Sequence, residues 1–149
     1  MASELGKGEV EVAVFLRFLE ASRLPIDWNS IEKRSPPEPD ILCTHQSEGA
    51  VAFELVEMCD SRLARSIAKA SDGYLRTSDP SPNIISKKLR KKYKTAVPVE
   101  LLCYTAGRII TPDNVILSRI KPYLRTWRHT FSRAWLLGRK GVYVVWDAG

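Results

Sequence analysis

The amino-acid sequence predicts a mixed α/β (α+β) fold in which helices pack on a central sheet. Three observations predict it. The length of 149 residues is the usual size of one domain. Amphipathic helical patterns alternate with short apolar runs rich in β-branched residues. The last two apolar runs flank the turn sequence Gly-Arg-Lys-Gly. We therefore expect a single domain over residues 1–149, with a core at about 8–105 and an extension at about 112–147.

The first half of the chain predicts one helix and two strands. The helix covers residues 9–24, because its apolar residues recur at i, i+3, i+4 and i+7, and Pro25 ends it. Residues 29–39 carry three prolines and several charges, so they predict a loop. Strands follow at about 40–45 and 50–59, the second after Gly49. This order places the two strands side by side.

The second half predicts three helices, a strand and a closing hairpin. Asp60 can cap a helix at about 61–71. Further helices are expected at about 82–94 and at 113–126, the latter interrupted by Pro122, with an apolar strand at 97–104 between them. Strands at about 131–137 and 142–147 form a C-terminal β-hairpin.

The composition predicts a soluble, cytoplasmic protein. No apolar run approaches the length of about 18 residues that a membrane span needs. Charged residues occupy the N-terminal segment where a signal peptide would be apolar. Cys43, Cys59 and Cys103 each lie in an apolar run, which indicates buried free thiols in a reducing compartment. A zinc ion shared by Cys43 and His45 is the alternative, with fewer ligands than such sites use.

Charge is divided unequally between the two halves. Residues 1–60 hold 12 acidic and 5 basic side chains, for −7, and residues 61–149 hold 5 acidic and 18 basic ones, for +13. A basic half favours a polyanionic partner, and nucleic acid, DNA in particular, is the commonest. A solvated face, or a membrane or acidic protein partner, is the alternative. The predicted phosphate contacts are Lys87, Lys88, Arg90, Lys91, Lys92 and Lys94.

Two carboxylates in the acidic half predict a metal site. Asp40 follows Pro39, and Glu54 lies fourteen residues later inside an apolar strand. On adjacent strands the two carboxylates can meet at one side of the sheet. A buried carboxylate is costly unless it is paired or binds a cation, and a hard ion such as Mg²⁺ takes oxygen ligands. The alternative is that Asp40 is a turn residue after proline and that Glu9 is an exposed carboxylate at the start of a helix, favoured there by the helix dipole, which leaves Glu54 the hardest to explain without a metal.

These motifs resemble those of the PD-(D/E)xK nuclease superfamily. Pro39-Asp40 matches its first motif and Glu54 its second, and Gly8-Glu9 resembles the first helix of the small resolvase-like members. The resemblance implies a restriction-endonuclease-like fold in which Glu9, Asp40 and Glu54 hold Mg²⁺ or Mn²⁺. Val56 stands where the family has its lysine, so a helix lysine such as Lys69 or Lys88 would replace it.

The resemblance implies a metal-dependent endonuclease acting on DNA. The alternative is a catalytically inactive nuclease-like fold that binds nucleic acid or regulates a partner enzyme, and Val56 is the main argument for it. A membrane partner is not expected, and a homodimer is compatible with the sequence.

Overall fold

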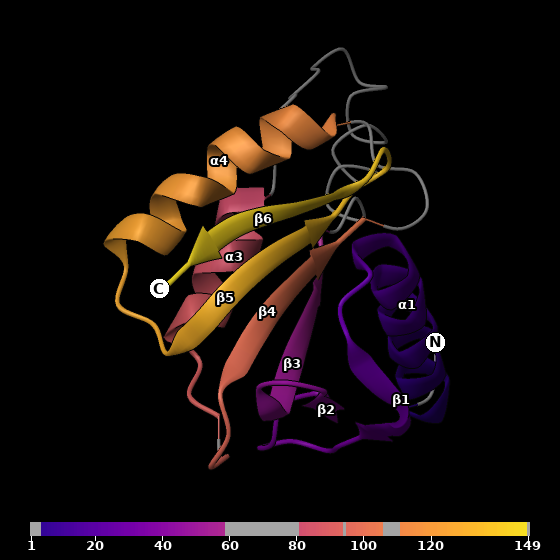
Figure 1. The fold of residues 1–149 in the computed structure, drawn as a ribbon. Coiled ribbons are helices and arrows are strands. Elements are labelled where there is room, and N and C mark those ends of the chain that lie inside the picture. Colours follow the sequence, from indigo (N-terminus) through magenta and orange to yellow (C-terminus); the bar gives the residue numbers. More distant parts are fainter. Residues whose placement is uncertain (1–3, 59–80, 94, 106–110, 149) are drawn as a thin grey trace.

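The computed structural model describes residues 4–58, 81–93, 95–105 and 111–148, and these residues form one six-stranded sheet with helices on both faces (Figure 1). The elements, in chain order, are α1 (Glu4–Ser22), β1 (Ile26–Lys33), β2 (Ile41–His45), β3 (Gly49–Glu57), α3 (Ser81–Arg90), β4 (Val99–Tyr104), α4 (Asp113–Thr126), β5 (Phe131–Leu137) and β6 (Val142–Asp147). The predicted mixed fold of helices on a sheet is thus confirmed.

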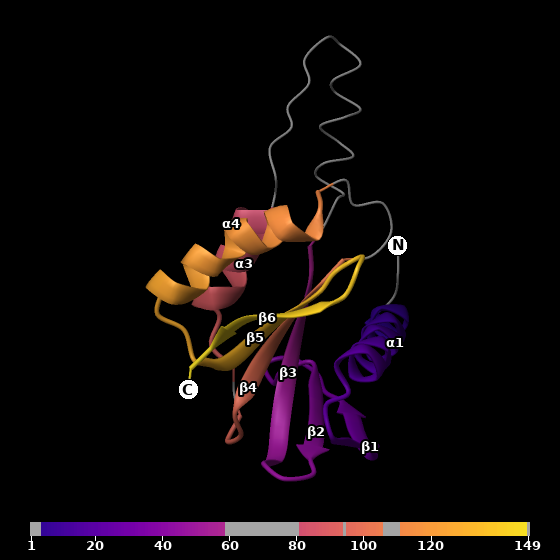
Figure 2. The same ribbon diagram turned by 45° about the horizontal axis from the view of Figure 1, so that its top comes forward.

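The strands lie in the sheet in the same order as in the chain, from β1 to β6. The pairs β1–β2, β2–β3 and β5–β6 are antiparallel, whereas β3–β4 and β4–β5 are parallel. Figure 2 shows α1 on one side of the sheet and α3 with α4 on the other. The parallel strands at the centre are therefore covered on both faces, as parallel sheets generally are.

Strand β3 divides the core into two parts, because its side chains alternate between the faces. Phe53 packs against α1, with ring centroids 4.9 Å from Phe15 and 5.9 Å from Phe18. Val56 belongs to the opposite part of the core, which includes Ile85 of α3 and residues of α4. Glu54 shares the side of Val56 and consequently faces α3.

Three predictions about the elements were wrong. The segment predicted as a loop at 29–39 contains most of β1, which pairs with β2 through a bulge between Asp27 and Glu32. Helix α3 ends at Arg90, four residues early, within a run of cations that repel one another along a helix. Helix α4 continues through Pro122 without a break. The predicted helix at 61–71 lies outside the described residues.

Cys43 and Cys103 are buried and free, while Cys59 lies outside the described part of the chain. Among the described helices, none combines the length and the apolar character that crossing a membrane requires.

Candidate functional site

Asp40 and Glu54 lie side by side, as their predicted positions on adjacent strands allow. The pairing of Ile41 with Phe53 puts Asp40 opposite Glu54. Glu54 Oε1 accepts a hydrogen bond from the Asp40 backbone N–H at 3.1 Å, and Asp40 Oδ2 accepts one from the Leu55 N–H at 2.9 Å. Each carboxylate therefore holds the backbone of the other strand, which fixes the two acidic groups beside each other.

Lysines from two segments, the end of α3 and β1, neutralise this pair. Lys88 of α3 donates to Glu54 Oε2 at 3.0 Å, and Lys91 Nζ lies 3.6 Å from the same atom. On the other side, Lys33 Nζ of β1 lies 3.6 Å from Asp40 Oδ1 and 3.4 Å from Glu11 Oε1. We call the three carboxylates and three lysines together the carboxylate cluster; its members are Glu11, Asp40, Glu54, Lys33, Lys88 and Lys91.

Burial dominates the electrostatics of the cluster. Glu54 is 2% exposed, and this desolvation raises its pKa; the nearby Asp40 charge raises it further, while Lys88 opposes both effects. The hydroxyl of Tyr93 has a raised pKa for the same reasons, burial first and the Glu54 charge second. Glu54 is thus buried at the inner end of the cluster, where an unpaired charge would be expensive, while the lysines of the cluster are partly exposed.

Glu9, the third predicted metal ligand, does not join Asp40 and Glu54. It is exposed on α1 and lines a largely apolar cleft of about 630 Å³ between α1 and residues 33–36. Glu11 takes the inward position, because it lies four and seven residues before Phe15 and Phe18, which are both fully buried. The glutamate that the structure places beside Lys33 is thus Glu11 and not Glu9, and its spacing to Phe15 and Phe18 is visible in the sequence.

The donor set does not fit a divalent cation as it stands. Among the described residues, no group of three His, Cys, Asp or Glu side chains lies close enough to hold a metal ion. The three carboxylates of the cluster already face three lysines, so an entering cation would have to displace an ammonium group such as that of Lys88. Bound Mg²⁺ or Mn²⁺ stays a prediction. Lys69 lies outside the described residues.

A second charged site lies at the end of α3. A cleft of about 380 Å³, which we call the basic groove, is lined by Leu89, Arg90, Lys91, Lys92, Arg128, His129 and Thr130. Lys92 and Arg128 are exposed, and within the described residues neither makes an ion pair. The Arg90 guanidinium lies 4.9 Å from the centroid of the Trp127 ring. The groove therefore presents cations that no carboxylate of the described chain covers, Lys91 excepted.

Of the six predicted phosphate contacts, three line the basic groove: Arg90, Lys91 and Lys92. Lys87 is exposed on α3 outside the groove, Lys88 turns toward Glu54, and Lys94 lies outside the described residues. Arg128 and His129 join from the segment after α4, a juxtaposition that depends on tertiary packing. One of the ring nitrogens of His129, Nε2, lies 2.9 Å from the Leu124 carbonyl, so it donates there and leaves Nδ1 as the acceptor in the neutral ring.

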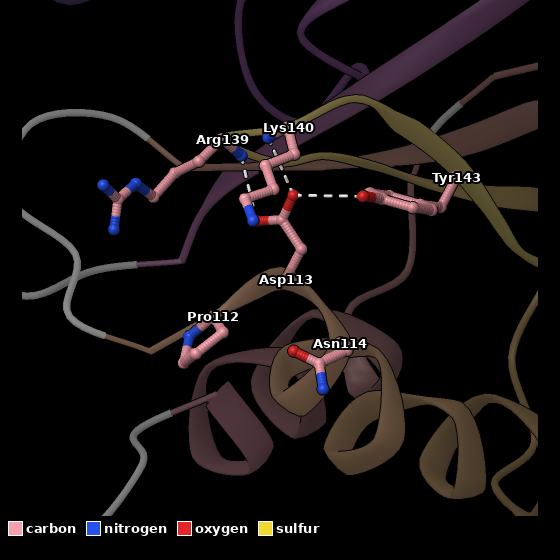
Figure 3. Close-up of a pocket in the computed structure, with 6 residues that line it drawn as sticks. All are labelled: Pro112, Asp113, Asn114, Arg139, Lys140 and Tyr143. Atoms are coloured by element: carbon pink, nitrogen blue, oxygen red, sulfur yellow. Dashed lines mark hydrogen bonds between the residues drawn. The ribbon is translucent and has the colours of Figure 1, made fainter.

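A third cleft, of about 540 Å³, lies where α4 meets the β5–β6 turn (Figure 3). Its Asp113 is 7% exposed and accepts hydrogen bonds from the backbone N–H groups of Arg139 and Lys140, each at 2.9 Å, and from the Tyr143 hydroxyl at 3.3 Å. Gly138 allows this approach, because a Cβ there would overlap the Asp113 carboxylate. Asp113 thus fastens the hairpin to α4.

A fourth site was missed by sequence analysis. Glu100 lies in β4, 5% exposed, and accepts a hydrogen bond from the Trp135 indole N–H at 2.7 Å, with Arg133 Nη1 at 3.6 Å. Burial raises its pKa, while the Trp135 hydrogen bond and the Arg133 charge lower it. The signal in the sequence was the same as for Glu54, a lone glutamate inside an apolar strand.

Comparison with known proteins gives a fold but no family. No known protein family matches the chain, and no curated protein matches it. A solved structure of a protein of unknown function, PA4535 from Pseudomonas aeruginosa strain PAO1, described as monooxygenase superfamily, is similar with a TM-score of 0.51. The two are 19% identical, and the match covers 95% of this chain and 73% of the other.

These comparisons contradict the resemblance to the PD-(D/E)xK nucleases. The similar structure carries a monooxygenase-superfamily description, and no nuclease family matches. The prediction of a DNA endonuclease, and with it that of an inactive nuclease-like module, is therefore wrong. The prediction rested on two short motifs, and Val56 already replaced the lysine that the second motif requires. In the structure, Lys33 and Lys88 form ion pairs with the carboxylates that were expected to bind the metal.

Proposed function

We propose that this protein binds a phosphate-bearing ligand in the basic groove. The observation that carries the proposal is the pair Lys92 and Arg128, two exposed cations that line one cleft and make no ion pair within the described residues. Exposed cations that line one concave site attract anions, because the cleft concentrates their electrostatic field. A phosphate group suits them, because Arg offers a planar fork of donors and Lys a compact charge.

Other groups in the groove support this ligand class. Arg90 is held over the Trp127 ring, so part of its side-chain entropy is already lost before a ligand arrives. Lys91 is shared, since it lines the groove and its Nζ also lies 3.6 Å from Glu54 Oε2. We expect Lys92 and Arg128 to make the main phosphate contacts and Lys91 to contribute less.

The chemistry of the ligand fits two sources. One is an extended polyanion, and nucleic acid is the partner that the sequence predicts. The other is a small phosphorylated molecule held at a single site. Counterion release separates them, because affinity for a polyanion falls linearly with salt on a logarithmic scale, with a slope set by the number of phosphate contacts. A cytoplasmic location, which would supply both ligands, belongs to this proposal.

The test measures the affinity of the full chain for a short fluorescent single-stranded oligonucleotide, with inorganic pyrophosphate as competitor. We expect binding at low salt, and a loss of roughly tenfold or more when Lys92→Glu and Arg128→Glu are combined. The salt slope should fall by about 1.4, the value for two phosphate contacts to a single strand. Displacement by equimolar pyrophosphate would identify a small ligand, and resistance to it an extended one.

The matched control is Arg17→Glu, which reverses an exposed charge on α1 across the sheet from the groove. It should leave the affinity within about twofold, because exposed charges separated by more than a Debye length of about 10 Å are largely screened. No binding of either phosphate probe at low salt would overturn the proposal. An equal loss in Arg17→Glu would show that net charge alone attracts the probe, which would overturn it as well.

A further inference from the structure

A projecting bulge on β1 has surface chemistry complementary to that of the basic groove. Trp28 is 48% exposed, one of three large apolar side chains with this degree of exposure among the described residues. It sits in the segment where the pairing of β1 with β2 shifts, between Asp27 and Glu32. We call residues 27–32 the Trp28 knuckle.

Hydrogen bonds hold the knuckle in shape. The Asp27 side chain accepts from the Asn29 N–H at 3.0 Å, and the Ser30 hydroxyl donates to the Asp27 carbonyl. Ser30 Oγ also accepts from the Thr44 N–H of β2 at 2.8 Å, which ties the knuckle to the sheet. An exposed tryptophan on a fixed backbone costs little entropy to bury, and tryptophan is the residue most enriched among binding hot spots.

The knuckle is acidic as well as aromatic. Asp27 makes no ion pair within the described residues. Glu32, whose side chain is 60% exposed, accepts a hydrogen bond from Arg34 Nη1 at 3.1 Å through Oε1. These acidic residues stand before and after Trp28 in the chain, and an indole ring attracts cations to its face. A partner that fits this surface is cationic, concave and rich in guanidinium or ammonium groups.

The basic groove of the same chain has these properties. It is a cleft of about 380 Å³ whose lining includes Lys92 and Arg128, and within it the Arg90 guanidinium already lies over the Trp127 ring. The knuckle and the groove come from the two oppositely charged parts of the sequence, residues 1–60 at −7 and 61–149 at +13 by the counts of acidic and basic residues. The acidic, aromatic knuckle of one copy is therefore complementary in charge to the basic groove of another.

We infer that a second copy of this chain docks its Trp28 knuckle in the basic groove. The contact is heterologous, so it closes into a dimer only if both grooves can be filled at once, and otherwise extends head to tail. The inference rests on the groove of the proposed function, and it implies that self-association and phosphate binding compete. A phosphate ligand should then dissociate the assembly.

Sedimentation equilibrium of the full chain over a range of concentrations tests the contact. At low salt the average mass should rise above that of the monomer with increasing concentration, and at high salt the rise should disappear. Trp28→Ala should weaken association about tenfold or more. The control Val144→Ala removes a side chain of similar exposure, 49%, from β6 and should leave the association unchanged.

A charge exchange makes the test specific for this pair of surfaces. Glu32→Arg places a cation on the knuckle and leaves the groove unaltered, and Arg128→Glu places a carboxylate in the groove and leaves the knuckle unaltered. Each variant alone should be monomeric, and their equimolar mixture should associate again. Glu32 is chosen because Asp27 shapes the knuckle through its hydrogen bond to Asn29.

The outcomes separate this inference from the proposed function. Monomeric mass at every concentration in low salt, or equal weakening by Trp28→Ala and Val144→Ala, would overturn the docking and leave phosphate binding standing. At protein concentrations too low for association, Trp28→Ala should bind the oligonucleotide as the unaltered chain does. If phosphate probes fail to bind but association is lost in Trp28→Ala and restored in the mixture, the docking stands and the proposed function fails.

Discussion

The carboxylate cluster and the basic groove lie next to each other at the end of α3. The charges of the cluster are compensated within the protein, whereas most of the cations of the groove have no carboxylate partner in the described residues. In the cluster, three carboxylates face three lysines, and Glu54 is almost fully buried. In the groove, Lys92 and Arg128 are exposed and make no ion pair within the described residues. Lys91 belongs to both, because it lines the groove and approaches Glu54.

This difference separates charges that serve the fold from charges that are free for a ligand. A buried charge is costly unless it is compensated inside the protein, so Glu54 recruits Lys88 whatever the protein does. An exposed cation is solvated and needs no partner, so a gathering of them in one cleft calls for another explanation. The buried Glu54 carried the metal-site prediction from the sequence, whereas the exposed cations Lys92 and Arg128 are the better candidates for ligand binding.

The largest effect should come from removing the cation of the buried pair. Lys88→Met leaves Glu54 buried without its 3.0 Å partner, and we expect unfolding free energy to fall by about 3 kcal/mol, the lower end of the range for a broken buried pair, because Lys91 remains nearby. Urea unfolding at neutral pH measures it. The same substitution at Lys92 should cost less than about 0.5 kcal/mol. Equal losses at the two positions would abolish the distinction between the sites.

Much of the fold was predictable because local patterns agree with it. The alternation along β3 predicted that Phe53 and Glu54 face opposite sides, and Phe53 indeed packs on α1 while Glu54 meets α3. Strand β1 was missed because its polar, exposed residues show no apolar alternation and prolines follow it. Its pairing is held by β2 and by the Ser30 bond to Thr44, neither of which is visible locally.

The site was predictable only as far as strand register reaches. The meeting of Asp40 with Glu54 follows from two adjacent antiparallel strands. The partners of these carboxylates come from elements far apart in the chain, Lys33 on β1 and Lys88 on α3, so their arrival depends on tertiary packing. Without those lysines, the pattern suggested a metal ion.

A smaller effect is expected at Glu100, a buried carboxylate that accepts a hydrogen bond from the neutral Trp135 indole at 2.7 Å and has its cation, Arg133, farther away at 3.6 Å. Burial raises the pKa of Glu100, so its protonation contributes stability that is present below the unfolded pKa of about 4.3 and is lost as pH rises through the folded value. Glu100→Gln keeps an acceptor for Trp135 and does not titrate. We expect its stability relative to the unaltered chain to increase between about pH 4 and pH 7. Parallel pH profiles from urea midpoints would contradict this.

The smallest expected change in unfolding free energy comes from Lys92 in the groove, and it is a gain, whereas the change at Lys88 is a loss. Lys92 stands among Arg90, Lys91 and Arg128, and its repulsion from them is not offset by a carboxylate in the described residues. Lys92→Gln should therefore raise the unfolding free energy by roughly 0.3 kcal/mol at low salt, the scale of a like-charge pair at a surface. The gain should vanish near 1 M salt, where the Debye length is about 3 Å. A loss of stability that persists in high salt would mean that Lys92 has a partner in the fold, and the groove would then have one cation fewer to offer a ligand.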